Sequence, residues 1–442
     1  MVSIFLLVLA VLIAGGWWYL RPIAPIATGY AAKMLCSGVF VSERHADAVT
    51  ADFPENPLVP FLRTSVDESS GRVDATLLGV WGSTAWFTPG YGCTLAEQRP
   101  DLPPAMEVHA GQPAVPWPFG DAGPRSTPPE LAAAIDTAFR EDDPDDRIKD
   151  TRAVVVVHEG RLVAERYAEG IEADTPLIGW SMTKSVANAL TGRLVARGVI
   201  GIDQTDLLPM WASDDRRNIS VEHLLHMATG LEFEEVYDPG TDATRMLFRP
   251  GDTGEYAASK PLAAPPGSRW HYSSGNTNIL CDVLHREADA DTDLFHELVF
   301  APLGMHTAVL EPDAAGDPVC SSNLYASAKD WARFGQWFLE DGFWNGERLL
   351  PDGWVAYSTS PARLDTGGTP YGAHWWLNSG PGGTRRMPSV PADAYWASGN
   401  EGQQLVVVPS EELVIVRLGR SADFDSIDWG LEELVAGVIA AL

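Results

Sequence analysis

The stretch LIGWSMTKSVANAL, residues 177–190, decides how the rest of the sequence is interpreted. After Ser181, apolar residues recur at helical spacing, and Gly198 follows a basic last turn. This pattern predicts a helix over about 182–197. Residues three apart lie on one face of a helix, so Lys184 is expected to project back toward Ser181.

This spacing suits nucleophilic catalysis. A serine hydroxyl becomes a useful nucleophile when a neighbouring base takes its proton, and a lysine serves as that base where burial keeps it neutral. The Ser181 N–H, at the start of the helix, is placed to face a developing oxyanion. A Ser-x-x-Lys spacing arises roughly once by chance in a chain of this composition. However, the chain has only five lysines, and only Lys184 has a serine three positions before it. We therefore take Ser181 and Lys184 as the candidate nucleophile and base.

The composition is that of a globular protein and excludes one class of partner. The chain has 442 residues, of which 45% are hydrophobic and 10% aromatic, enough for two or three structural units. Its 60 Asp and Glu residues outnumber its 31 Lys and Arg residues, which gives a formal charge of −29. Binding to a phosphate backbone needs clustered cations, so we expect no nucleic-acid partner.

The first twenty residues read as a membrane-targeting segment. Residues 1–20 contain no Asp, Glu, Lys or Arg, and residues 5–13 are an unbroken apolar run. The basic leader of a secretory signal is missing, and Trp17-Trp18-Tyr19 suits a membrane interface. Since about 18 to 20 apolar residues just suffice to cross a bilayer, we favour an uncleaved anchor over a cleaved signal. Arg21 and Lys33 follow the segment and would by themselves favour the inside for the rest of the chain, so the charges do not establish the orientation.

The cysteines favour a structural role. Cys36, Cys93, Cys281 and Cys320 lack the close pair spacings of a zinc site, so we expect no metal and no other cofactor. Cys36 and Cys93 both precede the catalytic region, and an oxidising compartment would allow them to form a disulfide. For Cys281 and Cys320 the sequence is equally compatible with buried thiols.

The remaining chain divides into an accessory region and a catalytic unit. Residues 21–125 carry short strand-like segments and end in a proline-rich linker over 113–129, and we assign no chemistry to them. Residues 151–158 and 161–167 predict a hairpin around Glu159-Gly160. Two further strands are expected over 399–409 and 412–418, followed by a helix from 428 to 442. The predicted domains are therefore a membrane segment (1–20), an accessory region with its linker (21–125) and a hydrolase domain (126–442).

Several segments together resemble the class C beta-lactamase-like serine hydrolases, a family that includes esterases, D-aminopeptidases and 6-aminohexanoate-dimer hydrolases. The resemblance covers about residues 130–442, and its motifs occur in the family's order. They are SMTK (181–184), LLHMATGL (224–231), PG (266–267), YSS (272–274) and PLGM (302–305).

This resemblance implies a fold and a mechanism. The fold is α+β, an antiparallel sheet flanked by helices with an inserted helical subdomain, here preceded by a small N-terminal region. Ser181 would form an acyl-enzyme, while Lys184 and Tyr272 share the proton. The oxyanion would be held by the Ser181 N–H and a backbone N–H of the Ser398-Gly399-Asn400 segment, with Asn400 as the expected donor. Family members are usually exported, which implies a periplasmic or other extracytoplasmic catalytic domain.

Two departures from the family pattern bear on the substrate. The usual Tyr-x-Asn is Tyr272-Ser273-Ser274, and the third motif, Ala397-Ser398-Gly399, lacks the cation that would meet a beta-lactam carboxylate. The pattern is therefore closer to the 6-aminohexanoate-dimer hydrolase and esterase branch. The sequence leaves open the alternative that Arg385 or Arg386 replaces the missing cation.

These observations predict a serine hydrolase acting on a small ester or amide. Beta-lactamase or D-aminopeptidase activity is the first alternative. A penicillin-binding-like sensor domain that binds a cell-wall peptide without turnover is the second. An unrelated Ser-His-Asp hydrolase is disfavoured, because no serine lies in a Gly-x-Ser-x-Gly elbow.

Overall fold

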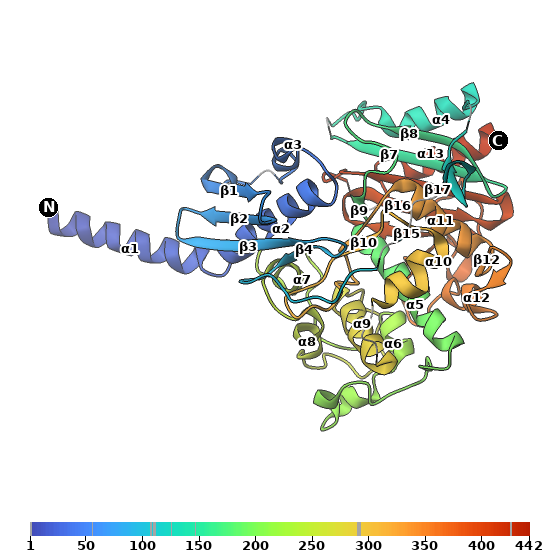
Figure 1. Cartoon of the computed structure of the whole chain (residues 1–442). Coiled ribbons are helices and arrows are strands. Elements are labelled where there is room, and N and C mark those ends of the chain that lie inside the picture. The colour runs from blue at the N-terminus through green and yellow to red at the C-terminus, as the bar shows by residue number, and fades with distance from the viewer. Residues whose placement is uncertain are drawn as a thin grey trace.

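The computed structural model describes residues 2–54, 56–106, 108, 112–124, 126–145, 147–289, 293–424 and 427–442. In this part of the chain a six-stranded antiparallel sheet forms the centre of the molecule (Figure 1). Its strands, in spatial order, are β14 (Trp376–Leu377), β15 (Tyr395–Gly399), β16 (Gln403–Val408), β17 (Leu413–Gly419), β7 (Thr151–His158) and β8 (Arg161–Tyr167). The predicted hairpin is thus confirmed as β7 and β8, and the first and last thirds of the catalytic unit meet where β17 pairs with β7.

Helices cover both faces of this sheet, which explains why its central strands are apolar along their whole length. On β7, Val154 and Val156 pack toward α4 (Pro129–Phe139) and α13 (Leu431–Ala441). Val155 and Val157 pack into the larger core with α5 (Thr183–Ala196) and α11 (Ala328–Leu339). The predicted nucleophile helix is therefore confirmed as α5, on the inner face of the sheet.

In the sequence, a mostly helical subdomain is inserted between the hairpin and the C-terminal strands, as the family resemblance implied, and most of it lies below the sheet in Figure 1. It carries the segment 224–231 and the Tyr272 loop, and a disulfide joins Cys281 to Cys320 within it, a pairing that the sequence left open. Its α-helices are α6 (Val221–Leu225), α7 (Asp242–Phe248), α8 (Thr253–Ala258), α9 (Ser274–Ala288), α10 (Ala301–Leu303) and α12 (Trp354–Ser358). Its short strands are β10 (Val309–Leu310) and β11 (Leu324–Ala326), which join β9 (Leu177–Ile178) in a small sheet, and β12 (Phe343–Trp344), paired with β13 (Glu347–Arg348).

The N-terminal region forms a separate layer of helix on sheet. Its long helix packs on a four-stranded antiparallel sheet, and the disulfide between Cys36 and Cys93 joins helix and sheet as expected. The elements are α1 (Val2–Leu20), α2 (Ala24–Phe40), α3 (Ala46–Ala51), β1 (Leu62–Asp67), β2 (Arg72–Leu77), β3 (Trp81–Thr88) and β4 (Gly92–Leu95).

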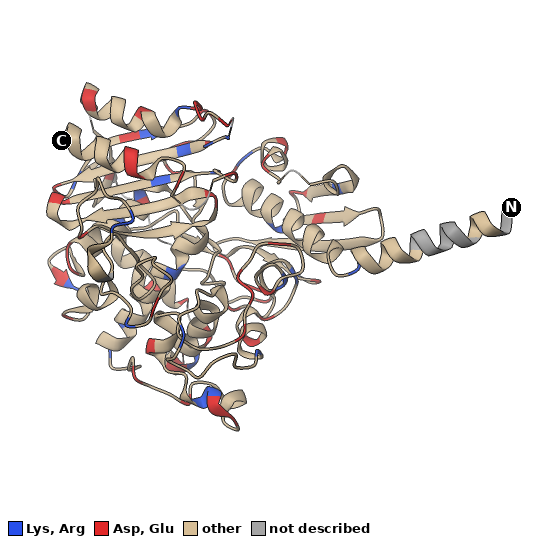
Figure 2. Ribbon diagram, turned by 180° about the vertical axis from the view of Figure 1, so that it is seen from behind, with Lys and Arg blue, Asp and Glu red and all other residues tan. Residues whose placement is uncertain are grey.

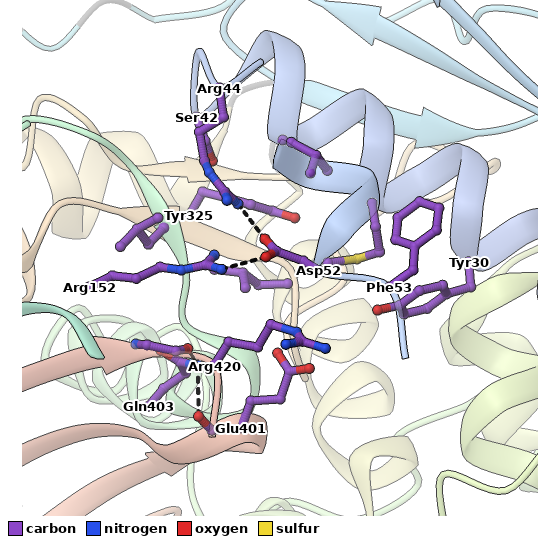
Figure 3. A pocket seen from close by; sticks show the side chains of 16 residues that line it. Tyr30, Ser42, Arg44, Asp52, Phe53, Arg152, Tyr325, Glu401, Gln403 and Arg420 are labelled. Atoms are coloured by element: carbon purple, nitrogen blue, oxygen red, sulfur yellow. Dashed lines mark hydrogen bonds and ion pairs between the residues drawn. The ribbon is translucent and has the colours of Figure 1, made fainter. Parts of the chain in front are cut away.

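Buried polar contacts fix this region to the catalytic unit. Lys33 on α2 forms an ion pair with the fully buried Glu311, which also accepts hydrogen bonds from Ser37 Oγ (2.8 Å) and the Cys93 N–H (2.7 Å). Nearby, Asp52 accepts hydrogen bonds from Arg44 and from Arg152 of β7, both at 2.7 Å (Figure 3). A buried charge is tolerated only when it is paired and hydrogen-bonded, so these contacts specify one placement of the N-terminal region.

The segment interpreted as a linker is also held in place. It contains β5 (Gln112–Pro116) and β6 (Gly120–Ala122), which pair in parallel. Arg333 of α11 donates hydrogen bonds to the carbonyl oxygens of Pro118 and Gly120 and forms an ion pair with Asp121.

Helix α1 extends away from the body, and its described part carries no charged residue (Figures 1 and 2). Among the described helices, none is by itself long and apolar enough to cross a membrane. Residues 14–20 and 24–40 together have the length and composition of a membrane span, but the two helices are bent by 48° relative to each other. The second member of that pair is α2, which packs inside the protein.

Candidate active site

The candidate nucleophile lies on a tight turn between β9 and α5. Residues 180–182 form a single 3-10 turn, in which Trp180 has a positive φ of 46°. The Trp180 indole N–H donates a hydrogen bond to Glu401 (3.2 Å). Gly179 is required beneath this turn, because a Cβ there would lie 2.3 Å from the ring of Trp331. The turn presents a partly exposed Ser181 above a buried Lys184.

The amine of Lys184 is held by three oxygen atoms. Its Nζ lies 2.8 Å from Ser181 Oγ, 3.0 Å from Ser274 Oγ and 2.9 Å from the Ser321 carbonyl oxygen. Burial lowers the pKa of Lys184 from 10.5 to about 8, although the charge of Glu235 works against this shift. A substantial fraction of the amine is therefore neutral near pH 8.

The neighbours of Lys184 decide where its lone pair points when it is neutral. The Ser321 carbonyl oxygen only accepts hydrogen bonds, and the Ser274 hydroxyl is committed to Glu235, with the two oxygens 2.5 Å apart. The remaining partner is Ser181 Oγ, whose hydrogen is the one free to be donated to Lys184. The contact between Glu235 and Ser274 thus directs the base toward the nucleophile.

A pH profile tests this arrangement. With neutral Lys184 as the candidate base, kcat/KM for an ester is expected to rise about tenfold per pH unit below pH 8 and to level off above it. The charge of Glu235 raises the pKa of Lys184, so Glu235→Gln is expected to move the rise in activity to lower pH. Profiles of kcat/KM from pH 5.5 to 9.5 for both proteins provide the measurement. An unchanged midpoint in the variant would contradict the proposed coupling.

Tyr272 lies on the other side of the amine. Lys184 Nζ is 5.1 Å from the centre of its ring, and its hydroxyl interacts with that of Ser181. The ring stacks on Trp376 (5.4 Å) and meets Tyr371 edge to face (5.9 Å). Burial, followed by Tyr371 and Glu235, raises the pKa of Tyr272 well above 10, so this group is a neutral phenol, which is chemically able to donate or relay a proton.

Two further residues of the site, Glu235 and Tyr237, belong to no sequence motif and could not be predicted from the sequence. Glu235 accepts hydrogen bonds from both the N–H (2.7 Å) and the hydroxyl of Ser274. The Tyr237 hydroxyl interacts with those of Ser181 and Ser274, and burial of that end together with Glu235 raises the pKa of Tyr237. Both residues belong to a loop before α7 that lacks periodicity, and only folding brings them to Ser181.

The predicted oxyanion segment does meet the nucleophile turn. Strand β15 ends at Gly399, where an added Cβ would lie 2.2 Å from the Gly179 carbonyl oxygen, so glycine is needed for this close approach. The Ser398 hydroxyl accepts a hydrogen bond from Gln404 (3.0 Å), and Asn400 is exposed beside the turn.

The possible replacement cations lie elsewhere. Arg385 donates hydrogen bonds to the carbonyl oxygens of Pro388 and Val390, in the loop before β15. Ser398 and Gly399 are at the opposite end of this strand, so neither Arg385 nor its neighbour Arg386 takes the place of the missing third-motif cation.

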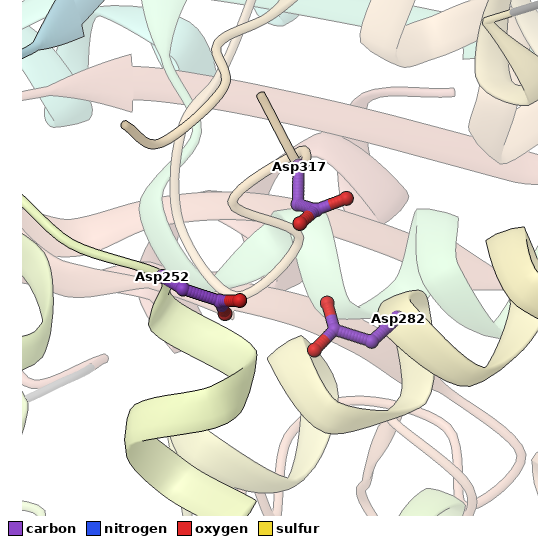
Figure 4. A group of neighbouring side chains, drawn as sticks. All are labelled: Asp252, Asp282 and Asp317. Carbon is purple, nitrogen blue, oxygen red and sulfur yellow. The ribbon is translucent and has the colours of Figure 1, made fainter. Parts of the chain in front are cut away.

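One group of side chains in the described part of the chain has the composition of a metal site. The carboxylates of Asp252, Asp282 and Asp317 lie within 4.8 Å of one another (Figure 4). Oxygen-only ligands of this kind suit Ca²⁺ or Mg²⁺. A proton also relieves the repulsion, because burial and the neighbouring aspartates raise the pKa of Asp282 to about 8. None of the three contacts Ser181 or Lys184, so we assign them no part in the chemistry.

Comparison with known proteins identifies the family of the chain. A family model described as Beta-lactamase matches residues 145–428. The 6-aminohexanoate-dimer hydrolase of Paenarthrobacter ureafaciens is 27% identical over 333 residues, which cover 69% of this chain and 82% of that protein.

Solved structures share the fold. A putative 6-aminohexanoate-dimer hydrolase from Bacillus anthracis has a TM-score of 0.60 at 23% identity, covering 76% of this chain and 89% of its own. EstCE1, described as a hydrolase with promiscuous acyltransferase activity, has a TM-score of 0.56 at 16% identity. The match covers 70% of this chain and 98% of EstCE1. Since the family model spans more than half of the chain and includes Ser181 and Lys184, this protein belongs to the beta-lactamase family and has the fold of its serine hydrolases.

Proposed function

We propose that this protein hydrolyses a small ester or amide through a covalent acyl-enzyme on Ser181. The observation that carries the proposal is the 2.8 Å contact between Lys184 Nζ and Ser181 Oγ, in surroundings that lower the pKa of the lysine to about 8. A neutral amine at this distance accepts the seryl proton as Oγ attacks the carbonyl carbon.

The proposed reaction has two halves. In the first, the Ser181 Oγ–carbon bond forms as the seryl proton passes to Lys184. The bond between the carbonyl carbon and the leaving group then breaks, and the proton on Lys184 is relayed through Tyr272 to the departing alcohol or amine, which leaves Lys184 neutral again. In the second, a water oxygen attacks the acyl carbonyl while Lys184 takes up a proton from the water. The Ser181 Oγ–carbon bond then breaks, and Lys184 returns this proton to Oγ as the acid is released. The N–H groups of Ser181 and Asn400 are the proposed oxyanion donors in both halves.

We expect esters and small amides to be better substrates than beta-lactams. A desolvated beta-lactam carboxylate without a cation costs several kcal/mol. The third motif offers it only the Ser398 hydroxyl, and Arg420 faces Glu401 instead (Figure 3). The relative named above as a 6-aminohexanoate-dimer hydrolase also supports an amide substrate.

The kinetic test compares kcat/KM for nitrocefin with that for p-nitrophenyl acetate and butyrate. The esters are expected to exceed nitrocefin by at least about 100-fold, the factor that corresponds to about 3 kcal/mol. A small panel of D-amino-acid amides in the same assay separates aminopeptidase activity from esterase activity. A higher kcat/KM for nitrocefin than for either ester would establish a beta-lactamase in place of the proposed function.

We also propose that α1 anchors the protein to a membrane, with the catalytic domain on an extracytoplasmic side. Trp18 and Tyr19 at the end of α1 are 80% and 64% exposed, as interfacial aromatic residues are expected to be. The two disulfides favour an oxidising compartment. Deleting residues 2–20 is expected to move the protein from the carbonate-washed membrane fraction to the soluble fraction. Recovery of the full-length chain in the soluble fraction would contradict the anchor.

A further inference from the structure

A cavity of about 280 Å³ lies between the N-terminal region and the catalytic unit, and its walls are mostly apolar. The N-terminal region contributes Ile23 and Ala27 at the start of α2, together with Leu58 and Leu62. Glu401 is the only charged side chain among the lining residues that the structure describes, and the Trp180 N–H donates a hydrogen bond to it.

The cavity lies next to the catalytic residues, although Ser181, Lys184 and Tyr272 do not themselves line it. Trp180, which directly precedes Ser181, forms part of its wall, as does Asn400 at the proposed oxyanion site. Tyr237 also lines it, and the Tyr237 hydroxyl interacts with that of Ser181. A group bound in the cavity therefore lies beside the nucleophile.

The position of the cavity distinguishes the acyl group from the leaving group. A leaving group must depart next to its proton donor, which is on the side of Tyr272. Tyr272 stacks with Trp376 and meets Tyr371, and none of these three residues lines the cavity. The acyl group, which stays attached to Ser181, has the side of Trp180 and Asn400 available.

We propose that this cavity binds an apolar acyl chain of the substrate, so that the N-terminal region completes the active site. The inference rests on the proposed function and names its substrate class, esters or amides of medium-chain acids. An apolar cavity of about 150 Å³ accommodates benzene, so the present volume suits a chain of roughly six to ten carbons. Because Lys33 forms a buried ion pair with Glu311 and Asp52 forms a partly buried ion pair with Arg152, the outer wall has a defined position.

The test is a series of p-nitrophenyl esters from acetate to decanoate, measured with the full-length protein. Burial of one methylene group multiplies an equilibrium constant about three- to fourfold, so kcat/KM is expected to be about 100-fold higher for hexanoate than for acetate. Ala27→Phe, which fills the cavity from α2, is expected to reduce this ratio to below about fivefold. Leu58→Trp is expected to lower the same hexanoate-to-acetate ratio. Leu58 is a partly exposed loop position, so folding is not at risk.

The matched control is Ala48→Phe, the same substitution at an exposed position on α3 that does not line the cavity. It is expected to keep the wild-type ratio. A second series, alkyl acetates with lengthening alcohols, is expected to show no chain-length preference that depends on Ala27.

Each outcome separates the inference from the function on which it rests. Turnover of acetate with no increase toward hexanoate, or a chain-length preference that survives both cavity variants, would overturn the cavity assignment and leave the hydrolase intact. A preference that follows the alcohol chain would overturn the acyl assignment. Absence of turnover for every ester, with Ser181 unreactive toward a fluorophosphonate, would instead refute the proposed function.

Discussion

Replacing Ser181 by alanine is expected to lower kcat/KM for p-nitrophenyl esters by at least about ten-thousand-fold, the scale seen when a nucleophile is removed from a covalent mechanism. The substitution deletes one oxygen atom from a partly exposed side chain, and the buried Lys184 amine keeps its contacts with Ser274 Oγ and the Ser321 carbonyl oxygen. The melting temperature is therefore expected to stay within a few degrees of the wild type. Initial rates and thermal unfolding on the same preparation give both readouts. Turnover within tenfold of the wild type would show that the nucleophile is another residue.

Lys184→Ala is expected to be nearly as severe, with a loss of about a thousandfold or more, because the seryl proton then has no base within reach. Lys184 is buried, so truncation to alanine also leaves a cavity and removes the partner of the Ser321 carbonyl oxygen. Lys184→Met is the matched control, since it retains most of the volume and lacks only the amine. Equal losses in the two variants would assign the effect to the amine rather than to packing.

The double variant of Ser181 and Lys184 measures whether the two groups act as a unit. Groups that act together in one step give non-additive losses, so the double variant is expected to lose little beyond Ser181→Ala alone. Multiplied losses would show that Lys184 is not coupled to the nucleophile.

The parts of the site that the sequence predicted are those encoded locally. Ser181 and Lys184 are one helical turn apart, so the apolar period of α5 was enough to bring them together. The hairpin of β7 and β8 has a strong strand pattern on both sides of Glu159-Gly160. Tyr272 and the Gly399 segment were found through motif resemblance, which carries order along the chain but no distances.

The residues that the sequence did not reveal depend on tertiary folding. Glu235 and Tyr237 lie in an irregular loop, and no sequence motif marks either residue. The disulfide of Cys281 with Cys320 closes a separation of 39 residues that no spacing rule predicts. The sequence assigns no chemistry to the accessory region, because the proposed contribution of this region is apolar surface, which has no sequence motif. Ala27 lines the cavity only because folding places α2 next to Trp180 and Asn400.

Covalent labelling tests the central claim most directly. The protein is incubated with a fluorophosphonate probe near pH 8, and the labelled peptide is identified by mass spectrometry, with residual ester hydrolysis followed in parallel. The account predicts one adduct per chain, on Ser181, with activity lost in proportion to labelling and no adduct in Ser181→Ala. An adduct on another residue, or an unlabelled Ser181 in an unmodified folded protein, would contradict it, and the second result would favour a pocket that binds without turnover.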